Sequence, residues 1–260
     1  MTVEFLTDPL LSGVTHGFFT RNGGVSAGRF ATLNCSLGGK DATDAVLENR
    51  RRAMDAMGFA PGALSGLHQV HGISVVEVTA PIPPDARPQA DGLVSRVPGQ
   101  VLGIVTGDCG PVLFADAEAG VAGACHAGWR GAVDGVMEAT IEAMIGLGAR
   151  REAIAAVLGP CIRQPSYEVG PDMRDAVLAR SIADARFFAP GKREDRWQFD
   201  LAGYCEARLL AAGVRAAVVD ADTLADEARF FSHRRNTLAI AAGAAPGPIG
   251  HQLSAIAVPG

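Results

Sequence analysis

The chain has 260 residues, of which 48% are hydrophobic and 20% are charged, and its formal net charge is −5. This is an ordinary globular composition, and the length allows a sizeable core. The acidic balance and the lack of a dense Lys/Arg run argue against nucleic acid as the main partner, while leaving room for a local basic pocket that holds a phosphate. No stretch of the sequence reaches the roughly 18 uninterrupted apolar residues that span a bilayer, so we expect no membrane segment.

The N-terminal segment and the cysteines both bear on the compartment. MTVEFLTDPLLSG carries acids and no basic region, so it is not typical of a signal peptide. The cysteines are odd in number and scattered along the chain, at Cys35, Cys109, Cys125, Cys161 and Cys205. This pattern suits a reducing cytosol better than a disulfide framework. We therefore expect a cytoplasmic protein.

Apolar patterning predicts helices and short strands that mix along the chain. Helical spacing predicts a helix over Thr43–Met57, a second over Val133–Met144, and two more over Gly170–Ile182 and Asp200–Ala212. Strand-length apolar runs occur at Ser74–Val78, Val101–Val105, Val112–Ala115, Val121–Cys125, Ala153–Leu158, Arg215–Val219 and Leu253–Val258. The proline-rich stretch 80–92 is interpreted as a surface loop. Because the elements do not alternate strictly as βαβ, we predict a mixed-sheet α/β or α+β fold.

Two histidines and a cysteine lie in segments that resemble functional turns. His71 lies in LHQVHG, Cys109 in VTGDCGPVLFAD and His126 in GACHAGWRGAV, each at the end of a predicted strand. Strand ends and the loops next to them are where rigid scaffolds present chemistry. Two imidazoles and one thiolate suit a Zn²⁺ ion that keeps its fourth position for water, which is the composition of a catalytic zinc site.

The spacing of these residues leaves other interpretations open. Neither interval matches a zinc finger or an HExxH helix, and Cys109 could instead be a small buried hydrophobe. The glycines around Cys109 and His126 favour the metal, because small residues let a ligand approach the backbone closely. His68 could be a fourth metal ligand, or it could contact one of the ligands without binding the metal itself. Asp108 could orient a ligand, serve as an acid–base group, or simply form a turn.

Taken together, the segments resemble the YfiH, or laccase-domain, family, which is also described as multicopper polyphenol oxidase and as purine nucleoside phosphorylase. HGFFTRNGGVSAGRFATLNCSLG (16–38) is followed, in the family's order, by LHQVHG, ADGLVS, TGDCGPVLFAD, CHAGWRG, LGPCIRQPSYEVG and FFSHRRN. The resemblance thus covers nearly the whole chain. After FFSHRRN the chain departs from the family, because TLAIAAGAAPGPIGHQL replaces a Gly-Arg-Met-like segment.

The resemblance implies a single domain over residues 1–260, in which mixed β-sheets are flanked by helices in a layered α/β/β/α arrangement. It implies a zinc ion bound by His71, Cys109 and His126. The implied activities are phosphorolysis of adenosine, inosine, guanosine and methylthioadenosine, and hydrolytic deamination of adenosine. The expected partners are therefore purine nucleosides and phosphate, whereas protein partners stay undetermined.

Phosphorolysis requires a site that holds an anion. A guanidinium group matches the oxygens of phosphate, so Arg21, Arg130 and one of Arg234 and Arg235 are candidate phosphate ligands. The alternative for each is an ordinary surface or salt-bridging arginine. Arg21 and Arg130 are favoured because glycines lie near them in the sequence.

Other polar residues in the motifs could contact the nucleoside or move protons. Asn34 and Gln69 are candidates for hydrogen bonds to ribose or base, as is His68. Deamination requires a proton shuttle, for which Asp108 and His68 are the candidates.

Two other enzyme classes compete with this interpretation. One is a copper-dependent polyphenol oxidase, since imidazole and thiolate also bind copper. A multicopper site needs many histidines, however, and the chain has six. The other is a metal-free hydrolase in which Cys109 is the nucleophile and His126 or His71 is its base. A non-enzymatic binding protein would not need this set of His, Cys, Arg and Asn in turns.

Overall fold

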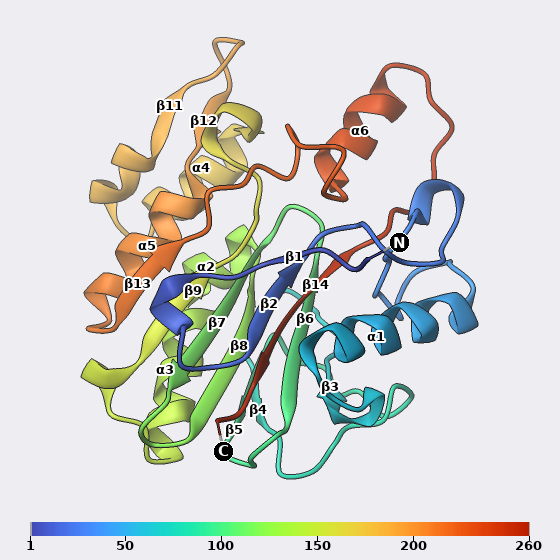
Figure 1. The fold of residues 1–260 in the computed structure, drawn as a ribbon. Helices are drawn as coiled ribbons and strands as arrows, with labels where there is room; N and C mark the ends of the chain where they lie inside the picture. The colour runs from blue at the N-terminus through green and yellow to red at the C-terminus, as the bar shows by residue number, and fades with distance from the viewer. Residues whose placement is uncertain (1, 260) are drawn as a thin grey trace.

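The computed structural model describes residues 2–259, and two packed β-sheets form its centre (Figure 1). The five-stranded sheet has the order β1 (Phe5–Leu6), β2 (His16–Phe19), β14 (Gln252–Ala257), β6 (Val101–Thr106), β3 (Leu64–Ser65). The six-stranded sheet has the order β13 (Arg215–Val218), β9 (Ala155–Leu158), β7 (Gly110–Asp116), β8 (Val121–Ala127), β5 (Gly92–Ser95), β4 (Val75–Glu77). Both contain parallel and antiparallel pairs, so both are mixed, as predicted.

Helices cover the outer faces of these two sheets. Helix α1 (Thr43–Met57) lies against the five-stranded sheet, and α3 (Val136–Gly146) and α5 (Leu201–Ala211) lie against the six-stranded sheet with the short α2 (Trp129–Asp134). A three-stranded sheet, β10 (Glu168–Val169), β12 (Trp197–Phe199), β11 (Phe188–Pro190), accompanies α4 (Pro171–Leu178), while α6 (His233–Ala241) follows near the C-terminus. The layers therefore run α/β/β/α, which confirms the arrangement implied by the family resemblance.

Each contact between layers has its own apolar core. Phe18, Ile104 and Leu113 are fully buried between the two sheets. One further core lies under α3 and α5, and another lies under α1. Strands β7 and β8 are buried along their whole length because each has a helix on one face and the other sheet on the opposite face. A strand covered on both faces is expected to be a nearly continuous apolar run, and both strands are apolar apart from Asp116 and His126 near their ends.

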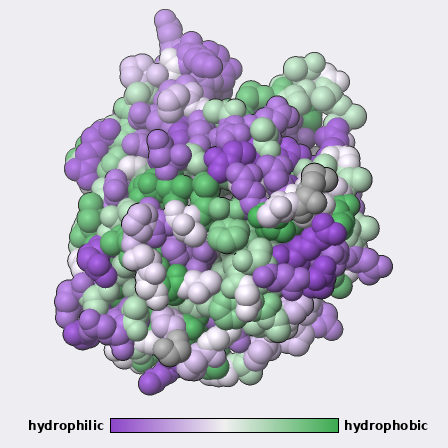
Figure 2. All heavy atoms as spheres, in the orientation of Figure 1, coloured by the Kyte–Doolittle hydropathy of each residue, from purple (hydrophilic) through white to green (hydrophobic). Residues whose placement is uncertain are grey.

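Helix α1 shows how the sequence pattern produces its element. Val46, Ala53, Met54 and Met57 form one buried stripe toward the sheet. The helix ends at Gly58, whose φ of 82° is a left-handed conformation that glycine adopts without steric cost. The opposite face is strongly hydrophilic (Figure 2). The predicted bounds of this helix are confirmed at both ends.

Several elements differ from the sequence prediction. The helix predicted over Val133–Met144 is broken at Gly135, where φ is 105°, and the second segment continues to Gly146. The helix predicted over Gly170–Ile182 covers only Pro171–Leu178. Helix α6 was not predicted, because it buries none of its side chains and so shows no apolar stripe. Within residues 2–259, every helix is too short or too polar to cross a bilayer.

The packing of the two sheets yields a first prediction, at Gly159. This glycine follows β9, and a Cβ placed on it would lie 2.1 Å from Cδ1 of the fully buried Phe18 ring of β2. Gly159→Ala should therefore separate the sheets locally and lower the free energy of unfolding by about 1–3 kcal/mol. Urea denaturation measures the change. Gly13→Ala, which has open space around the new methyl group, is the control and should stay near wild type. Equal stabilities for the two variants would contradict this packing.

Candidate metal centre

Three possible metal ligands, far apart in sequence, meet where the chain passes between the two large sheets. His71 lies between β3 of the five-stranded sheet and β4 of the six-stranded sheet. Cys109 lies in the turn from β6 to β7, which makes the same crossing, and His126 lies near the end of β8. One ligand atom from each lies within 4.8 Å of those of the other two. The two imidazole rings are 4.7 Å apart between centroids and nearly perpendicular, at 74°.

A buried carboxylate, Asp91, holds two of these ligands in place. Its side chain is fully buried at the start of β5 and accepts a hydrogen bond from Nδ1 of His126 at 2.8 Å. It also accepts hydrogen bonds from the main-chain N–H groups of Val70, His71 and Gly72, at 3.1, 3.0 and 2.7 Å. Because Nδ1 of His126 is engaged, its Nε2 is the atom left for a metal. A carboxylate that orients a histidine in this way is the usual outer partner of a metal-binding imidazole.

The backbone around the site has unusual conformations that bring the ligands together. His71 has φ of 62° and Asp108 has φ of 91°, values in the left-handed region that residues with a side chain seldom adopt. Gly128 lies against the ligands, because a Cβ there would lie 3.1 Å from Sγ of Cys109 and 3.6 Å from Nε2 of His126. Glycine at this position therefore leaves space for a group between the ligands.

The electrostatics of the site favour a thiolate. Burial opposes ionisation of Cys109, but His126 and His71 outweigh it and lower the pKa of the thiol to about 6. Burial also opposes protonation of His126, whereas Cys109 and Asp91 raise the pKa of that imidazole to about 9. Burial disfavours the charged form of Asp91 as well, yet hydrogen bonds from His126 and Gly72 lower its pKa. Two negative side chains are thus held beside two histidines, an arrangement that a divalent cation would stabilise.

This donor set fits zinc. One thiolate and two imidazoles in a cluster of this size suit an ion whose bonds to sulfur and nitrogen are about 2.0–2.3 Å long. Three protein ligands leave a fourth position for substrate or water. Among residues 2–259, this is the one group of three or more His, Cys, Asp or Glu side chains with the geometry to hold a metal.

The three ligands line a cavity of about 720 Å³. Its wall carries Arg87, Arg130 and Arg234 and a single acidic residue, Asp108. Trp129 and Tyr167 add aromatic faces, and the guanidinium groups of Arg130 and Arg234 lie 4.7 and 5.3 Å from the centres of these rings. The charged groups on the cavity wall of this acidic protein are therefore mainly basic, and aromatic faces lie beside them.

Besides Arg234, four other residues predicted from the sequence also line this cavity. His68 is exposed to it, and Arg130 is exposed beside Trp129. Gln69 hydrogen-bonds through its amide group to both the N–H and the C=O of Val105, which fixes the end of β6. Asp108 accepts hydrogen bonds from the hydroxyl of Thr223 at 2.7 Å and from the main-chain N–H of Arg234 at 2.6 Å.

Three predicted substrate-binding residues, Asn34, Arg21 and Arg235, are not part of the cavity wall. Asn34 is fully buried, where it donates to Asp41 and accepts from the N–H groups of Ser36 and His251. Arg21 donates to the carbonyls of Ala31 and Glu227 and lies over the Phe231 ring.

Arg235 donates to three main-chain carbonyls, those of Thr223, Leu224 and Phe230. The structure therefore gives Asn34, Arg21 and Arg235 contacts that hold loops together.

Sequence reasoning did not single out Asp91, Arg87, Tyr167 or His251. The Asp-Gly pair at the start of β5 is also typical of a simple turn, so nothing local distinguished Asp91. His251 lines the cavity with its Nδ1 buried and without a hydrogen-bond partner among the described residues, and burial lowers its pKa to about 4. Residues Gly247, Pro248 and Ile249 line the cavity too, so the segment that departs from the family pattern forms part of the wall.

Comparison with curated proteins finds relatives that are named purine nucleoside phosphorylase. The chain is 44% identical over 223 residues to a purine nucleoside phosphorylase of Deinococcus radiodurans, covering 86% of this chain and 84% of that protein. It is 38% identical over 243 residues to the purine nucleoside phosphorylase ORF3 of Streptomyces griseus, covering 91% and 95%.

Solved structures show the same fold. The YfiH protein of Bacillus licheniformis superposes with a TM-score of 0.86 at 27% identity, covering 95% of this chain and 94% of that one. YlmD of Geobacillus stearothermophilus gives 0.82 at 28% identity, covering 97% and 94%. The family model described as multi-copper polyphenol oxidoreductase laccase matches residues 15–258, which is nearly the whole chain. The chain therefore belongs to this laccase-like family, together with the YfiH proteins.

Proposed function

We propose that the protein is a zinc-dependent purine nucleoside enzyme. It would catalyse phosphorolysis of adenosine, inosine, guanosine and methylthioadenosine, and hydrolytic deamination of adenosine. The observation that carries the proposal is the cluster of one thiolate and two imidazoles at the wall of a cationic, aromatic cavity. The relatives named purine nucleoside phosphorylase support the same substrate class, purine nucleosides with phosphate.

The cavity has the size and lining that a nucleoside needs. Its volume of about 720 Å³ is within the ordinary range for small-molecule sites. Trp129 and Tyr167 offer flat apolar faces against which a purine can stack. His251 also lines the cavity, and its buried Nδ1 has no hydrogen-bond partner among residues 2–259.

The metal would be held by His71, Cys109 and His126. Zinc bound there would supply a Lewis acid next to the substrate. The protein's own part is to hold the ligands: Asp91 orients His126 and fixes the loop of His71, and Gly128 keeps the space between them open.

Proton transfer during deamination is assigned more readily to His68 than to Asp108. Both oxygens of Asp108 already accept hydrogen bonds from Thr223 and Arg234, so this carboxylate ties the turn of Cys109 to the start of α6. His68 is exposed in the cavity and its imidazole forms no side-chain hydrogen bond within residues 2–259. An imidazole can both accept and donate a proton, which is what a proton shuttle requires.

A copper-dependent polyphenol oxidase is the second candidate, favoured by the description of the matching family model. Multicopper chemistry needs several metal ions, whereas residues 2–259 bring together a single cluster able to hold one. Copper loading tests this alternative: turnover of a phenol with dioxygen by the copper protein, and none by the zinc protein, would favour it.

The first experiment is product analysis of the purified protein at known zinc content. With adenosine and phosphate we expect adenine and ribose 1-phosphate, and without phosphate we expect inosine and ammonia. Chromatography separates the two outcomes and ranks the two activities. If neither product forms from any of the four nucleosides while zinc is fully bound, the proposed function is wrong.

Loss of the thiolate provides the second test. Cys109→Ala should reduce bound zinc from about one ion per chain to near zero and abolish turnover, because two imidazoles alone hold the ion weakly. The fold should persist, since Cys109 lies in a turn and not in the core. Cys125→Ala, which changes a buried cysteine beside His126, is the matched control and should retain zinc. Full zinc occupancy and turnover in the Cys109 variant would exclude the site.

Alkylation of the zinc-free protein tests the electrostatics and the metal-free hydrolase alternative together. Because the pKa of Cys109 is lowered to about 6, its thiolate forms as pH rises through that value. The alkylation rate should increase around pH 6 and level off above pH 7, whereas an unperturbed thiol reacts around pH 8.5 or higher. The other four cysteines are buried and should react slowly. Mass spectrometry identifies the labelled residue.

Zinc should protect Cys109 from this reaction. Protection supports a metal ligand, whereas an equal rate with zinc and a hydrolytic activity of the zinc-free protein would support the nucleophilic cysteine instead.

A further inference from the structure

Helix α1 carries three consecutive arginines, and they differ in their partners. Arg51 and Arg52 both pair with Glu48 on the helix surface, at 2.7 Å in each case. Arg50 points toward the interior instead, where its Nη1 donates to the carbonyl of Cys35 at 3.2 Å. The salt bridges of α1 involve Arg51 and Arg52, and none joins Arg50 to an acidic residue of its own helix.

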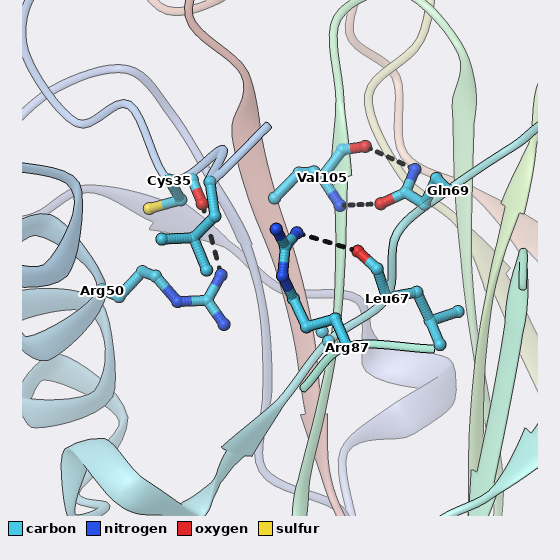
Figure 3. A pocket seen from close by; sticks show the side chains of 9 residues that line it. Cys35, Arg50, Leu67, Gln69, Arg87 and Val105 are labelled. Carbon is cyan, nitrogen blue, oxygen red and sulfur yellow. Dashed lines mark hydrogen bonds between the residues drawn. The ribbon is translucent and has the colours of Figure 1, made fainter. Parts of the chain in front are cut away.

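A second arginine meets Arg50 from the other side. Arg87, in the loop between β4 and β5, donates to the carbonyls of Pro84 and Leu67 at 2.9 and 3.1 Å. Figure 3 shows the guanidinium groups of Arg50 and Arg87 extending toward the same space from opposite sides. Both line a small cavity of about 10 Å³, which has room for about one water molecule.

This pair of positive charges is uncompensated. Neither guanidinium forms a salt bridge within residues 2–259, although both are half-buried. Burial lowers the pKa of Arg50, and repulsion by Arg87 lowers it further. Nε and Nη2 of Arg50 and Nη2 of Arg87 donate no hydrogen bond to the described residues. Placing two partly buried cations together costs free energy unless an anion offsets it.

Arg87 also connects this pair to the large cavity. The small and large cavities share Leu67, Gln69, Arg87 and Val105 in their walls. The large cavity is therefore lined by Arg87 and by the metal ligands at once.

A turn over residues 36–39 completes this side of the large cavity. Ser36, Gly38 and Gly39 line it, and Cys35 and Leu37 of the same segment line the small cavity together with Arg87. Within residues 2–259, neither the hydroxyl of Ser36 nor the main-chain N–H groups of Gly38 and Gly39 donate a hydrogen bond. Free N–H groups on a glycine turn, beside an arginine, are the donors with which proteins bind phosphate.

We infer that Arg87, the Ser36–Gly39 turn and the charge of Arg50 behind them form the binding site for inorganic phosphate in the large cavity. This inference rests on the proposed function, because it names the phosphate site of that reaction. In phosphorolysis an oxygen of hydrogen phosphate forms a bond to C1′ of the ribose as the bond from C1′ to N9 breaks. The electron pair goes to the purine, the proton of hydrogen phosphate ends on the released base, and the products are ribose 1-phosphate and purine.

The structure favours this site over the other arginines of the cavity. Arg130 is exposed and lies over Trp129, and Arg234 donates to the carbonyl of Glu168 and lies over Tyr167. Both are thus associated with the aromatic faces that suit a purine. Arg50 and Arg87 instead form a half-buried pair next to free N–H donors.

The experiment measures phosphate separately from nucleoside. Zinc-loaded wild type, Arg87→Gln, Arg87→Lys, Arg50→Gln and Arg130→Gln are titrated with inorganic phosphate alone by calorimetry, and their KM values for phosphate and for inosine are determined. Arg215→Gln, which changes an exposed arginine on β13, is the matched control. Zinc content and thermal unfolding are recorded for every variant, so that a misfolded one is recognised.

We expect Arg87→Gln to raise the Kd and the KM for phosphate by about tenfold or more, the loss typical of a charge-assisted hydrogen bond, and to change the KM for inosine little. Arg87→Lys should recover part of the loss, and Arg50→Gln should raise both phosphate constants by a smaller factor. A larger effect of Arg130→Gln than of Arg87→Gln would overturn the assignment. The assignment would also be overturned if Arg87→Gln weakened binding of adenosine 5′-monophosphate but not of inorganic phosphate. Arg87 would then bind a phosphate group of the nucleoside substrate and not the free phosphate ion.

The two proposals can fail separately. If wild type binds phosphate through Arg87 but forms no product from any nucleoside, the anion site stands and the proposed function falls. If wild type turns over nucleosides and Arg87→Gln leaves both phosphate constants unchanged, the function stands and this inference falls.

Discussion

The site depends on one buried carboxylate. Asp91 has no exposed surface, and its two oxygens accept four hydrogen bonds from the chain: one from the ring of His126 and three from successive N–H groups of Val70, His71 and Gly72. A buried carboxylate is costly unless it is fully hydrogen-bonded. The loop that carries His71 must therefore close on Asp91 in the folded state, and this closure brings His71 to His126.

The same interaction explains why a strained residue is tolerated in this loop. His71 has a positive φ, a conformation that costs free energy for a residue with a Cβ. The hydrogen bonds to Asp91 on both sides of it hold the loop in that shape. Cys109 reaches the cluster differently, in the turn between β6 and β7, where the adjacent Asp108 is also in the left-handed region and is fixed by Thr223 and Arg234.

The second constraint is the passage of the chain between the two large sheets. The connections β3 to β4 and β6 to β7 both leave the five-stranded sheet and enter the six-stranded one. Polar groups on such connections cannot be buried in the apolar core between the sheets, so they gather at its edge. There they line one cavity, with the metal ligands, the aromatic faces and Arg87 on its wall and Arg50 behind Arg87. A protein with a net charge of −5 thus keeps a cationic pocket, which suits an anionic co-substrate.

The sequence by itself determined the ligand types, the family and the main secondary structure. His71, Cys109 and His126 were recognisable because small-residue turns surround them at strand ends, and the helix over Thr43–Met57 follows directly from its apolar stripe. Tertiary structure alone decided which polar residues face the cavity. The sequence around Arg21 and Arg235, with glycine or a second arginine nearby, is typical of a phosphate-binding residue. In the folded chain, however, their guanidinium groups donate hydrogen bonds to main-chain carbonyls of other segments. Arg50 is one of three adjacent arginines, and only the packing of α1 turns it toward Arg87. Hydrogen bonds and charge pairs between segments far apart in sequence leave no local pattern, and for this reason Asp91 and the arginine pair emerge only from the folded chain.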